Sequence, residues 1–441
     1  MSALSVALLT GLVLAQPRVE YSATGRSDVR VRQTRTDATE TAEADVRNEN
    51  EVSLTPRLGL TATLLTLEGS LEYAPLVLVR NPVTQVGTEV MHNGVAELRW
   101  RLDRRTRLEL RQEIGSGERR LTLLDGTAAG GEVPLGGGGL GGGLGPGGPG
   151  GAGGSGGPLT PGGETGGALP PLEPLRLFHS YTRATFAHSF DRRVDGFARA
   201  GYLVTGGADD PTRETLPLLL GPILGLGADV RLTKRDRLAS EAQAQSADFA
   251  PQGQRTQLVQ LSAGYTRTLT RELGVSAGLG AAAGRNTVRP GTAGGAPGTG
   301  SGAEASDAWR PFPIARGGLD YILPLGGRQR LTARGALSYA PVMNPFNTEL
   351  EQQGALGGSL EWQPQPRYSV GASTLLSTYA RPAPAPVRQN LAVGLVGGWR
   401  PETWCQLDAS AGFSVEREGE GALRRSWLAQ LSFTASADGP L

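Results

Sequence analysis

The sequence is poor in the residues that enzymes and redox proteins use for chemistry. Its 441 residues include one cysteine and three histidines, and 5% of them are aromatic. A single cysteine, Cys405, excludes an internal disulfide. The histidines are His92, His179 and His188, and their spacing fits no metal site; His179 and His188 are an odd number of residues apart, so they face opposite sides of a strand. We therefore expect neither an enzyme nor a metal or other cofactor.

Long apolar runs and an excess of one charge are also missing. Beyond the N-terminus there is no run of about 20 apolar residues, the length that a transmembrane helix needs. Lysines and arginines together number 43 against 42 aspartates and glutamates, which gives a net charge of +1. Because nucleic-acid-binding surfaces are strongly basic, we expect no nucleic acid among the partners.

What the sequence does contain is alternation of apolar and polar residues. Segments 273–281, 330–339 and 406–415 each place apolar residues at every second position, and similar segments recur from residue 51 to the C-terminus. A period of two puts one set of side chains on each face of a strand. Repeated at this length, it predicts an all-β fold, a single transmembrane antiparallel β-barrel in the bacterial outer membrane, with an outer face in contact with outer-membrane lipid.

The connections between these segments alternate along the chain between short charged turns and longer Gly/Pro-rich stretches. Bacterial barrels have short periplasmic turns and longer external loops, so the alternation predicts the orientation of the chain. About 17 strands follow from residue 51 onward, and residues 18–33 supply one more by their own alternation. Because even counts are the rule, we expect about 18 strands, or 16 with an N-terminal arm outside the barrel.

The predicted organisation has four parts. Residues 1–15 read as a signal peptide, with an apolar stretch before a small-residue cleavage site. Residues 16–50 form an N-terminal arm or the first barrel strand, 51–436 the transmembrane barrel, and 437–441 a C-terminal tail. Within the barrel, the Gly-rich segments 126–173 and 286–308 predict flexible external loops, because glycine and proline runs bury too little apolar area to offset the entropy of ordering.

Aromatic residues gather near strand ends, where Trp and Tyr prefer the level of the lipid headgroups. One predicted band lies beside the short turns and comprises Trp100, Tyr265, Tyr321, Trp362, Tyr368, Trp399 and Trp404. The second band lies beside the long connections and comprises Tyr73, Tyr202, Tyr339, Tyr379 and Trp427.

The polar face of the strands carries charges of both signs. The pore-lining candidates are Glu97, Arg99, Arg101, Arg107, Glu109, Arg111, Glu113, Asp229, Arg231, Arg330, Arg334 and Asp408. Two neighbouring segments supply a charged ladder on one wall: Glu97, Arg99 and Arg101 on the first, and Arg107, Glu109, Arg111 and Glu113 on the second. Two interpretations are compatible with this ladder: cross-strand ion pairs that stabilise a wet interior, and a charged constriction that screens solutes. Most other positions on this face are Gly, Ala, Ser or Thr, which favours a water-filled lumen over a plugged one.

Several short motifs resemble porin-like outer-membrane β-barrel proteins of the kind abundant in myxobacteria. They are segments 55–60, 69–75 and 337–341, and the likeness spreads over most of residues 50–436. The strand 426–433 resembles the signal that the outer-membrane assembly machinery reads in this family, although residues 434–441 follow it. The resemblance implies that assembly machinery as a partner.

Together these observations favour a porin-like channel for passive passage of small hydrophilic solutes. A surface-interaction or adhesion barrel that acts through its Gly-rich loops without conductance is one alternative. A transporter for a hydrophobic substrate is another, although it would need an N-terminal plug, and residues 18–50 are too polar to resemble one. The solute and the oligomeric state do not follow from the sequence.

Overall fold

The structure, a computed structural model, describes residues 18–37, 45–82, 87–119, 175–250, 253–288, 308–343, 350–380, 387–418 and 423–440. The expected signal peptide (1–15) and the connection 126–173 lie outside these residues, and the connection 286–308 overlaps them only at its two ends. Among the described residues, no helix has the length and apolar character to span a membrane.

Strands make up almost all of the described chain, and each pairs antiparallel with its neighbours. Their bounds are β1 (Arg18–Thr36), β2 (Asp45–Leu64), β3 (Leu67–Tyr73), β4 (Leu76–Pro82), β5 (Gly87–Arg101), β6 (Thr106–Arg119), β7 (Leu175–Ser189), β8 (Val194–Gly207), β9 (Leu218–Arg231), β10 (Asp236–Ala250), β11 (Gln254–Thr268), β12 (Leu273–Val288), β13 (Arg310–Gly326), β14 (Gln329–Met343), β15 (Leu350–Gln365), β16 (Tyr368–Ala380), β17 (Arg388–Glu402), β18 (Cys405–Glu418) and β19 (Arg424–Pro440). A short helix, α2 (Asp210–Thr215), lies between β8 and β9.

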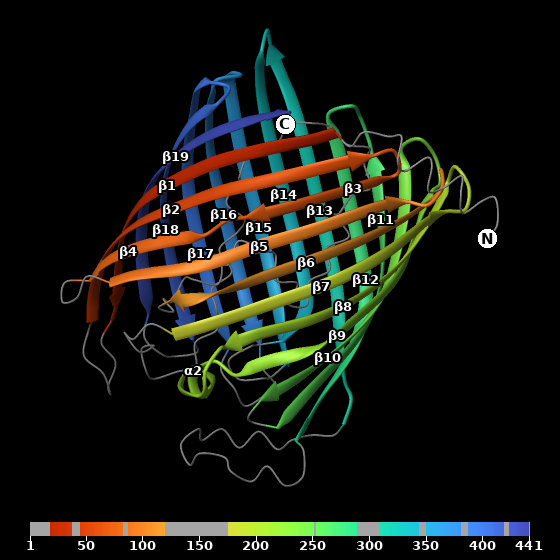
Figure 1. The fold of residues 1–441 in the computed structure, drawn as a ribbon, viewed down its shortest axis with the longest axis horizontal. Coiled ribbons are helices and arrows are strands. Elements are labelled where there is room, and N and C mark those ends of the chain that lie inside the picture. Colours follow the sequence, from red (N-terminus) through yellow and green to blue (C-terminus); the bar gives the residue numbers. More distant parts are fainter. Residues whose placement is uncertain are drawn as a thin grey trace.

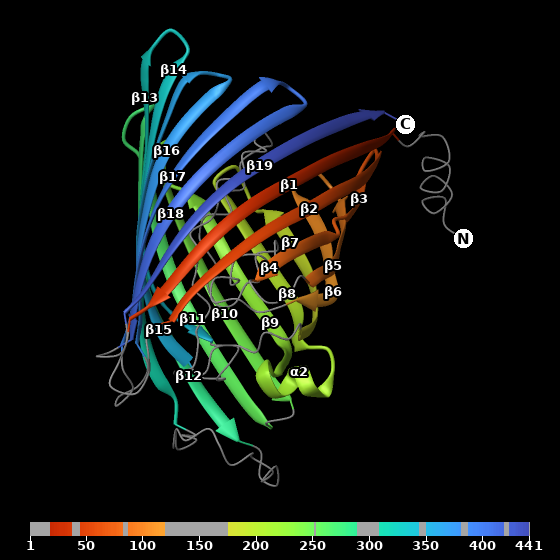
Figure 2. The same ribbon diagram turned by 90° about the vertical axis from the view of Figure 1, so that its left-hand side faces the viewer.

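The sheet closes on itself because β1 pairs with β19 on one side and with β2 on the other. β3 and β4 both pair with β2 and with β5, so together they fill a single position in the wall. The wall is therefore an 18-strand antiparallel barrel, which confirms the predicted fold class. Two perpendicular views show it as a tilted cylinder whose first and last strands lie side by side (Figures 1 and 2).

The break between β3 and β4 falls at Ala74-Pro75, about halfway along β5. The Ala74 N–H donates to the Asn93 carbonyl at 2.8 Å, and Pro75 has no N–H to continue the ladder. This part of the chain differs from the sequence-based prediction. Tyr73, opposite Gly94 in the register, lies mid-wall and not beside a long connection. His92 lies within strand β5.

The barrel wall includes both ends of the described chain. β1 begins at Arg18 and occupies a wall position, which is the one of the two arrangements considered for residues 16–50 in which they supply the first barrel strand. At the other end, β19 continues to Pro440, which pairs with Glu20, so nearly all of the predicted tail 437–441 belongs to the wall. The wall extends this far because closing the barrel pairs β19 with β1 along nearly the whole of both strands.

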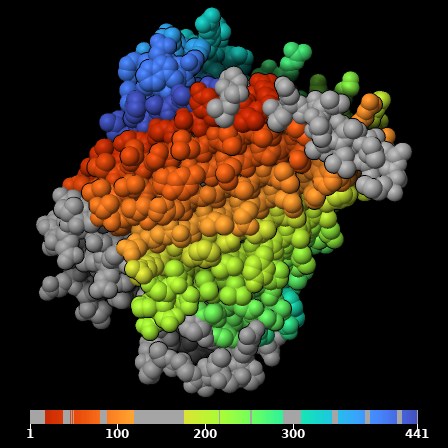
Figure 3. Space-filling view, in the orientation of Figure 1, coloured from red at the N-terminus to blue at the C-terminus, as the bar shows by residue number. Residues whose placement is uncertain are grey.

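Large apolar side chains project outward from the wall. Leu279 on β12 is 73% exposed, Leu261 on β11 63% and Leu395 on β17 61%, values that a soluble protein would not present all around its surface. Side chains cover the outer surface without a break from β1 to β9 (Figure 3). An antiparallel barrel with this apolar exterior is a porin-like outer-membrane protein that spans the bacterial outer membrane.

Four short turns share one hydrogen-bonding pattern. A side-chain oxygen of Asp103, Asp191, Thr233 or Thr270 accepts the backbone N–H groups two and three residues later, at 2.5–3.1 Å. These amides hold the pKa of Asp103 and of Asp191 below the ordinary aspartate value. Hydrogen bonds within each turn thus stabilise the short-turn end of the barrel.

Candidate functional site

The predicted charged ladder lies on the inner face of the wall, on β5 and β6. In the register Glu97 stands opposite Arg111, Arg99 opposite Glu109, and Arg101 opposite Arg107. The intervening Trp100 and Leu110 are 43% and 42% exposed on the outer face. Alternation in the sequence therefore places these charges together on one inner surface.

Most of the ladder is internally neutralised. Arg99 pairs with Glu97 and, at 3.3 Å, with Glu68 on β3. Arg111 Nε lies 2.6 Å from Glu113 Oε1. On the next strand Arg183 Nη2 lies 3.1 Å from Glu109 Oε1. Two of these contacts, Arg99 to Glu68 and Arg183 to Glu109, join neighbouring strands, whereas Arg99 to Glu97 and Arg111 to Glu113 join residues of one strand.

Arg101 and Arg107 are different. Both are exposed, and each faces the other across the β5–β6 pair, next to the short turn that joins the two strands. Within the described part of the chain, no carboxylate forms an ion pair with either. Two adjacent guanidinium groups consequently leave uncompensated positive charge at the short-turn mouth of the lumen.

The remaining candidates lie on the inner face of other strands and are not brought together. Asp229 pairs with Arg237, and Arg231 Nη2 lies 3.3 Å from Asp195 Oδ2. Each of the other three has its own polar neighbour: Arg330 donates to Gln363 at 2.8 Å, Arg334 lies 3.7 Å from Asp320, and Asp408 accepts from Gln406 at 2.9 Å.

The inner wall is open to solvent around β13 to β16. The side chains of Asp320 and Arg334 are 73% and 59% exposed, and Ser338 and Ser373 on the same face are exposed as well. The hydrogen-bonding groups here are guanidinium, carboxylate and hydroxyl groups, all able to bind a polar solute that passes.

Sequence reasoning missed a polar network at the closing seam. Asp28 on β1 is 4% exposed and accepts hydrogen bonds from Arg26, Ser53 and Gln430, which lie on β1, β2 and β19. Arg30 extends the network, because it donates to Gln430 at 3.0 Å and pairs with Glu51 at 3.1 Å. The alternating charges in residues 18–33 signalled an inner face, but their partners lie at the far end of the chain.

A second unpredicted feature is an apolar cluster inside the barrel near the long-connection end. Phe249 and Leu219 are 1% exposed, and Leu258, Ile314 and Met343 are each 2% exposed. Together with further residues of β7 to β15 they form a packed patch on the inner face. The only signal in the sequence was the loss of strict alternation in runs such as 218–220, typical of strands buried on both faces.

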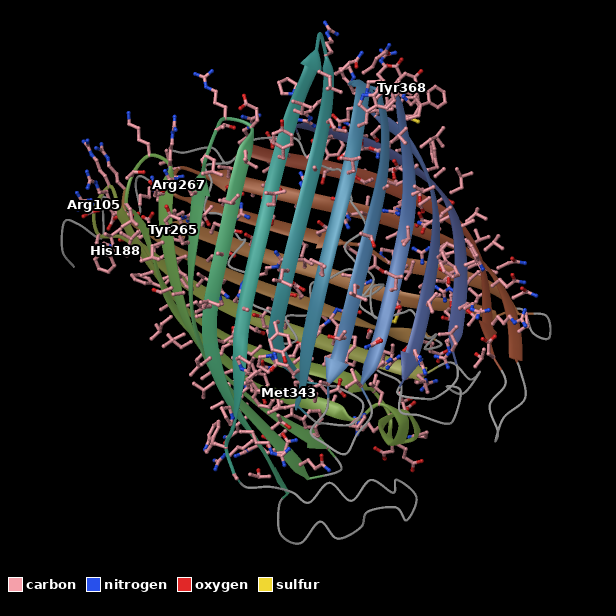
Figure 4. The ribbon with its side chains drawn as sticks, turned by 180° about the vertical axis from the view of Figure 1, so that it is seen from behind. Arg105, His188, Tyr265, Arg267, Met343 and Tyr368 are labelled. Atoms are coloured by element: carbon pink, nitrogen blue, oxygen red, sulfur yellow. The ribbon has the colours of Figure 1, made fainter. Side chains whose placement is uncertain are left out.

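The ends of β14 and β15 bend inward to cover this cluster. Pairing between β13 and β14 stops at Tyr339, and Gln352 on β15 instead donates to the carbonyl of Pro313 on β13 at 3.2 Å. A Cβ at Gly284 would lie 2.3 Å from Leu350 Cδ1, so the glycine makes room for the Leu350 side chain in its present position. Met343 lies at the end of the barrel opposite the short turns (Figure 4). The predicted lining of small residues therefore does not hold on the side of the lumen where this apolar cluster lies.

The aromatic residues at the short-turn end project outward, as Trp362 (43% exposed), Trp399 (44%) and Tyr368 (45%) illustrate. In the second predicted band Tyr202 and Trp427 also point outward, at 46% and 58% exposure. Tyr379 does not. It shares the inner face with Ser377, which is 1% exposed, and its hydroxyl accepts a hydrogen bond from Gln353 at 2.9 Å. It belongs to the lumenal wall, because Tyr379 lies an odd number of residues after the outward-facing Tyr368 on the same strand, and alternation places the two on opposite faces.

Among the described residues, no group of three His, Cys, Asp or Glu side chains is arranged to hold a metal ion. His179 lies on the inner face of β7, where its ring fills the space beside Gly115, and His188 on the outer face contacts Phe190 at 4.9 Å between ring centroids. The lumenal site therefore offers hydrogen bonds and charge to a solute.

Comparison with known proteins gives one family and several structural neighbours. The family model described as the EpsX exopolysaccharide export family matches residues 12–441. No curated protein matches the chain. The OccK9 (OpdG) structure of Pseudomonas aeruginosa is 12% identical, with a TM-score of 0.48 over 95% of this chain and 98% of that one. The outer-membrane protein OpdK of the same organism is 10% identical, with a TM-score of 0.45 over 94% and 99%. At this degree of likeness the strand pairing itself, and not the neighbours, defines the fold.

Proposed function

Because the chain belongs to the EpsX exopolysaccharide export family, we propose that it is an outer-membrane channel through which a polysaccharide molecule leaves the cell. The observation that carries the proposal beyond the family description is the solvent-exposed, polar inner wall of the barrel at β13 to β16. A barrel of 16–18 strands is wide enough for an aqueous channel.

The chemistry of that wall suits a sugar polymer. Each sugar unit presents hydroxyl groups that both donate and accept, and carboxylates, guanidinium groups and serine hydroxyls match them. Passage requires contacts that favour entry yet release the polymer at every step. Exposed side chains such as Ser338 and Arg334 give weak, repeated contacts of this kind, because water competes for the same groups.

The alternatives make different demands on the barrel. Passive diffusion of small hydrophilic solutes would use the same lumen, so it is the second candidate. A hydrophobic substrate would need an accessible apolar path, whereas the apolar side chains inside the lumen, such as Phe249, are packed against one another. A surface-interaction barrel would need no conductance at all.

A lumenal double variant on β14 and β16, compared with a lipid-facing variant on β16, tests the channel. Ser373 faces the lumen and its neighbour Ala372 faces lipid, and both are exposed. In planar bilayers, Ser373→Trp combined with Ser338→Trp should lower single-channel conductance, whereas Ala372→Trp should leave it unchanged. Folded protein without conductance would overturn the channel and support the surface-interaction barrel.

The cargo is tested in cells. Deleting the gene should remove polysaccharide from the cell surface while uptake of small sugars and amino acids stays at the wild-type level. Complementation with the lumenal double variant should restore less surface polysaccharide than Ala372→Trp does. Normal surface polysaccharide together with impaired uptake would replace export by small-solute diffusion.

A further inference from the structure

A groove lies on the outer face of the barrel, across β7 to β11 beside the short turns. Its volume is about 470 Å³, and apolar atoms make up most of its lining. Most of its lining residues face outward, so it opens toward the membrane, while Phe197, Gly227 and Glu241 between them belong to the inner face. None of the lumenal candidates from the sequence borders it.

The strand register explains the hollow. In one row across the wall, His188, Gly196, Ala228 and Ser240 stand opposite one another, so that three small residues follow the histidine. The next row, farther from the turns, carries the larger Phe186, Leu226 and Leu261, with Ala198 and Ala242 between them. The lipid-facing surface is recessed where the small residues of the two rows lie together between these bulky side chains.

Phe190 closes one end of the groove and links it to the turns. Its ring packs edge-on against His188 and approaches Gly196, where a Cβ would lie 2.8 Å from Phe190 Cε2. Its backbone carbonyl accepts a hydrogen bond from Arg105 at 3.4 Å. The groove therefore runs directly into the turns that join β5 to β6 and β7 to β8.

Those turns, and the one after β9, are strongly basic. Residues 102–105, 190–193 and 232–235 contribute Arg104, Arg105, Arg192, Arg193, Lys234 and Arg235, all of them exposed. Their only acidic residues are Asp103 and Asp191, whose carboxylates bind the backbone amides of their own turns. Arg105 and His188 lie at this corner of the barrel, together with Tyr265 and Arg267 (Figure 4).

The opposite wall lacks this combination. The turn between β13 and β14 has one cation, Arg328, the turn between β15 and β16 has Arg367, and the turn between β17 and β18 has none at residues 403–404. Cationic density thus follows the groove and does not spread around the whole rim.

We propose that this groove binds an acidic glycerophospholipid. An acyl chain would lie over Ala228 and Ser240, beside the Phe190 ring that covers Gly196, and the phosphate would meet Arg192, Arg193, Lys234 and Arg235. An apolar hollow that faces hydrocarbon is filled by lipid and not by water, because its lining offers few hydrogen-bonding groups. Clustered Lys and Arg at the edge of a membrane favour anionic headgroups, and arginine binds phosphate in a bidentate manner.

The test compares anionic and zwitterionic lipid on the purified barrel. In mixed micelles with equal amounts of phosphatidylglycerol and phosphatidylcholine, native mass spectrometry should show phosphatidylglycerol retained preferentially. Replacing Arg192, Arg193, Lys234 and Arg235 together with Ser should reduce that preference at least tenfold. These side chains are exposed in turns, so the wall should still form, which heat-modifiable mobility on a gel verifies.

Two tryptophan variants separate the groove from general effects. Ala228→Trp should fill the hollow and abolish retention, whereas Ala409→Trp, on the outer face of β18 near its own short turn, should not. Equal retention of both lipids by the wild-type protein, or equal loss from the two tryptophan variants, would overturn the proposal. Conductance does not enter the readout, so failure here leaves the channel proposal untouched.

Discussion

Gln430 on the last strand donates a hydrogen bond of 3.0 Å from its Nε2 to Oδ1 of Asp28 on the first strand. The two residues are 402 positions apart in the chain. Asp28 also binds Arg26 and Ser53, so its carboxylate joins three consecutive strands of the closed wall. Closure of the barrel consequently depends on side-chain contacts as well as on the backbone ladder.

Replacing Asp28 with Ala should destabilise the barrel. The change removes several hydrogen bonds to a buried charge and leaves Gln430 without its acceptor, a loss of about 1–3 kcal/mol. Urea unfolding in detergent, followed by tryptophan fluorescence, measures it. Asp320→Ala is the control, since its pair with Arg334 is exposed on both sides and exposed pairs contribute about 0–1 kcal/mol. Equal effects of the two variants would contradict a special role for the seam.

Ion selectivity should depend on Arg101 and Arg107. Replacing both with Ser removes the uncompensated charge at the short-turn mouth, so the reversal potential in a salt gradient should shift toward cations. The shift should shrink near 1 M salt, where the Debye length is about 3 Å. The matched control, Glu97→Gln with Arg99→Gln, removes an ion pair without changing net charge and should leave selectivity alone. An unchanged reversal potential in the first variant at low salt would place both arginines outside the ion path.

Met343→Ala should loosen the inward-bent ends of β14 and β15. Truncating a buried methionine costs about 2–5 kcal/mol, because the apolar contacts are lost and a cavity remains. We expect larger or noisier single-channel currents as these ends leave the apolar cluster. Met91, 6% exposed on β5, is buried outside that cluster, so Met91→Ala controls for general loss of stability. Identical currents in the two variants would separate the cluster from conductance.

An arginine on the lipid face should impair assembly. Leu279→Arg places a charge at one of the most exposed apolar positions of the outer wall, at a cost of about 2–4 kcal/mol near the bilayer midplane. Gly274→Arg on the same strand faces the lumen, where a Cβ meets no atom within 4 Å. The folded fraction after refolding into lipid vesicles distinguishes the two. Equal losses would mean that both faces of β12 are packed.

The short turns should lose part of their stabilising effect in acid. Because the folded-state pKa of Asp103 and Asp191 is lowered by backbone amides, each carboxylate stabilises the fold above its unfolded pKa of about 3.9. That contribution disappears as the pH falls through the lower folded value. The gap in urea midpoint between the wild type and Asp103→Ala/Asp191→Ala should therefore be full at pH 7 and vanish at strongly acidic pH. A gap that does not change with pH would assign the effect to turn geometry alone.

The sequence by itself determined the class of fold and the face on which most side chains lie. Alternation is a local property of an extended backbone, so the outward exposure of Leu279 and the inward position of Glu97 follow without knowledge of any partner. The same local chemistry predicted the short turns, where Asp103 and Asp191 accept from their own backbone amides. The prediction of about 18 strands depended on counting such segments and was confirmed.

Only the tertiary structure decided which strands meet and in what register. The contact between Asp28 and Gln430, the hydrogen bond from Gln353 to Tyr379, and the inward bend that brings Leu350 onto Gly284 all join different strands. The recess at Gly196, Ala228 and Ser240 likewise exists because the register aligns three small residues from three strands. Period-two alternation is the same for every neighbour and every even shift of register, so it carries no information about these pairings, and closure of the whole wall selects them.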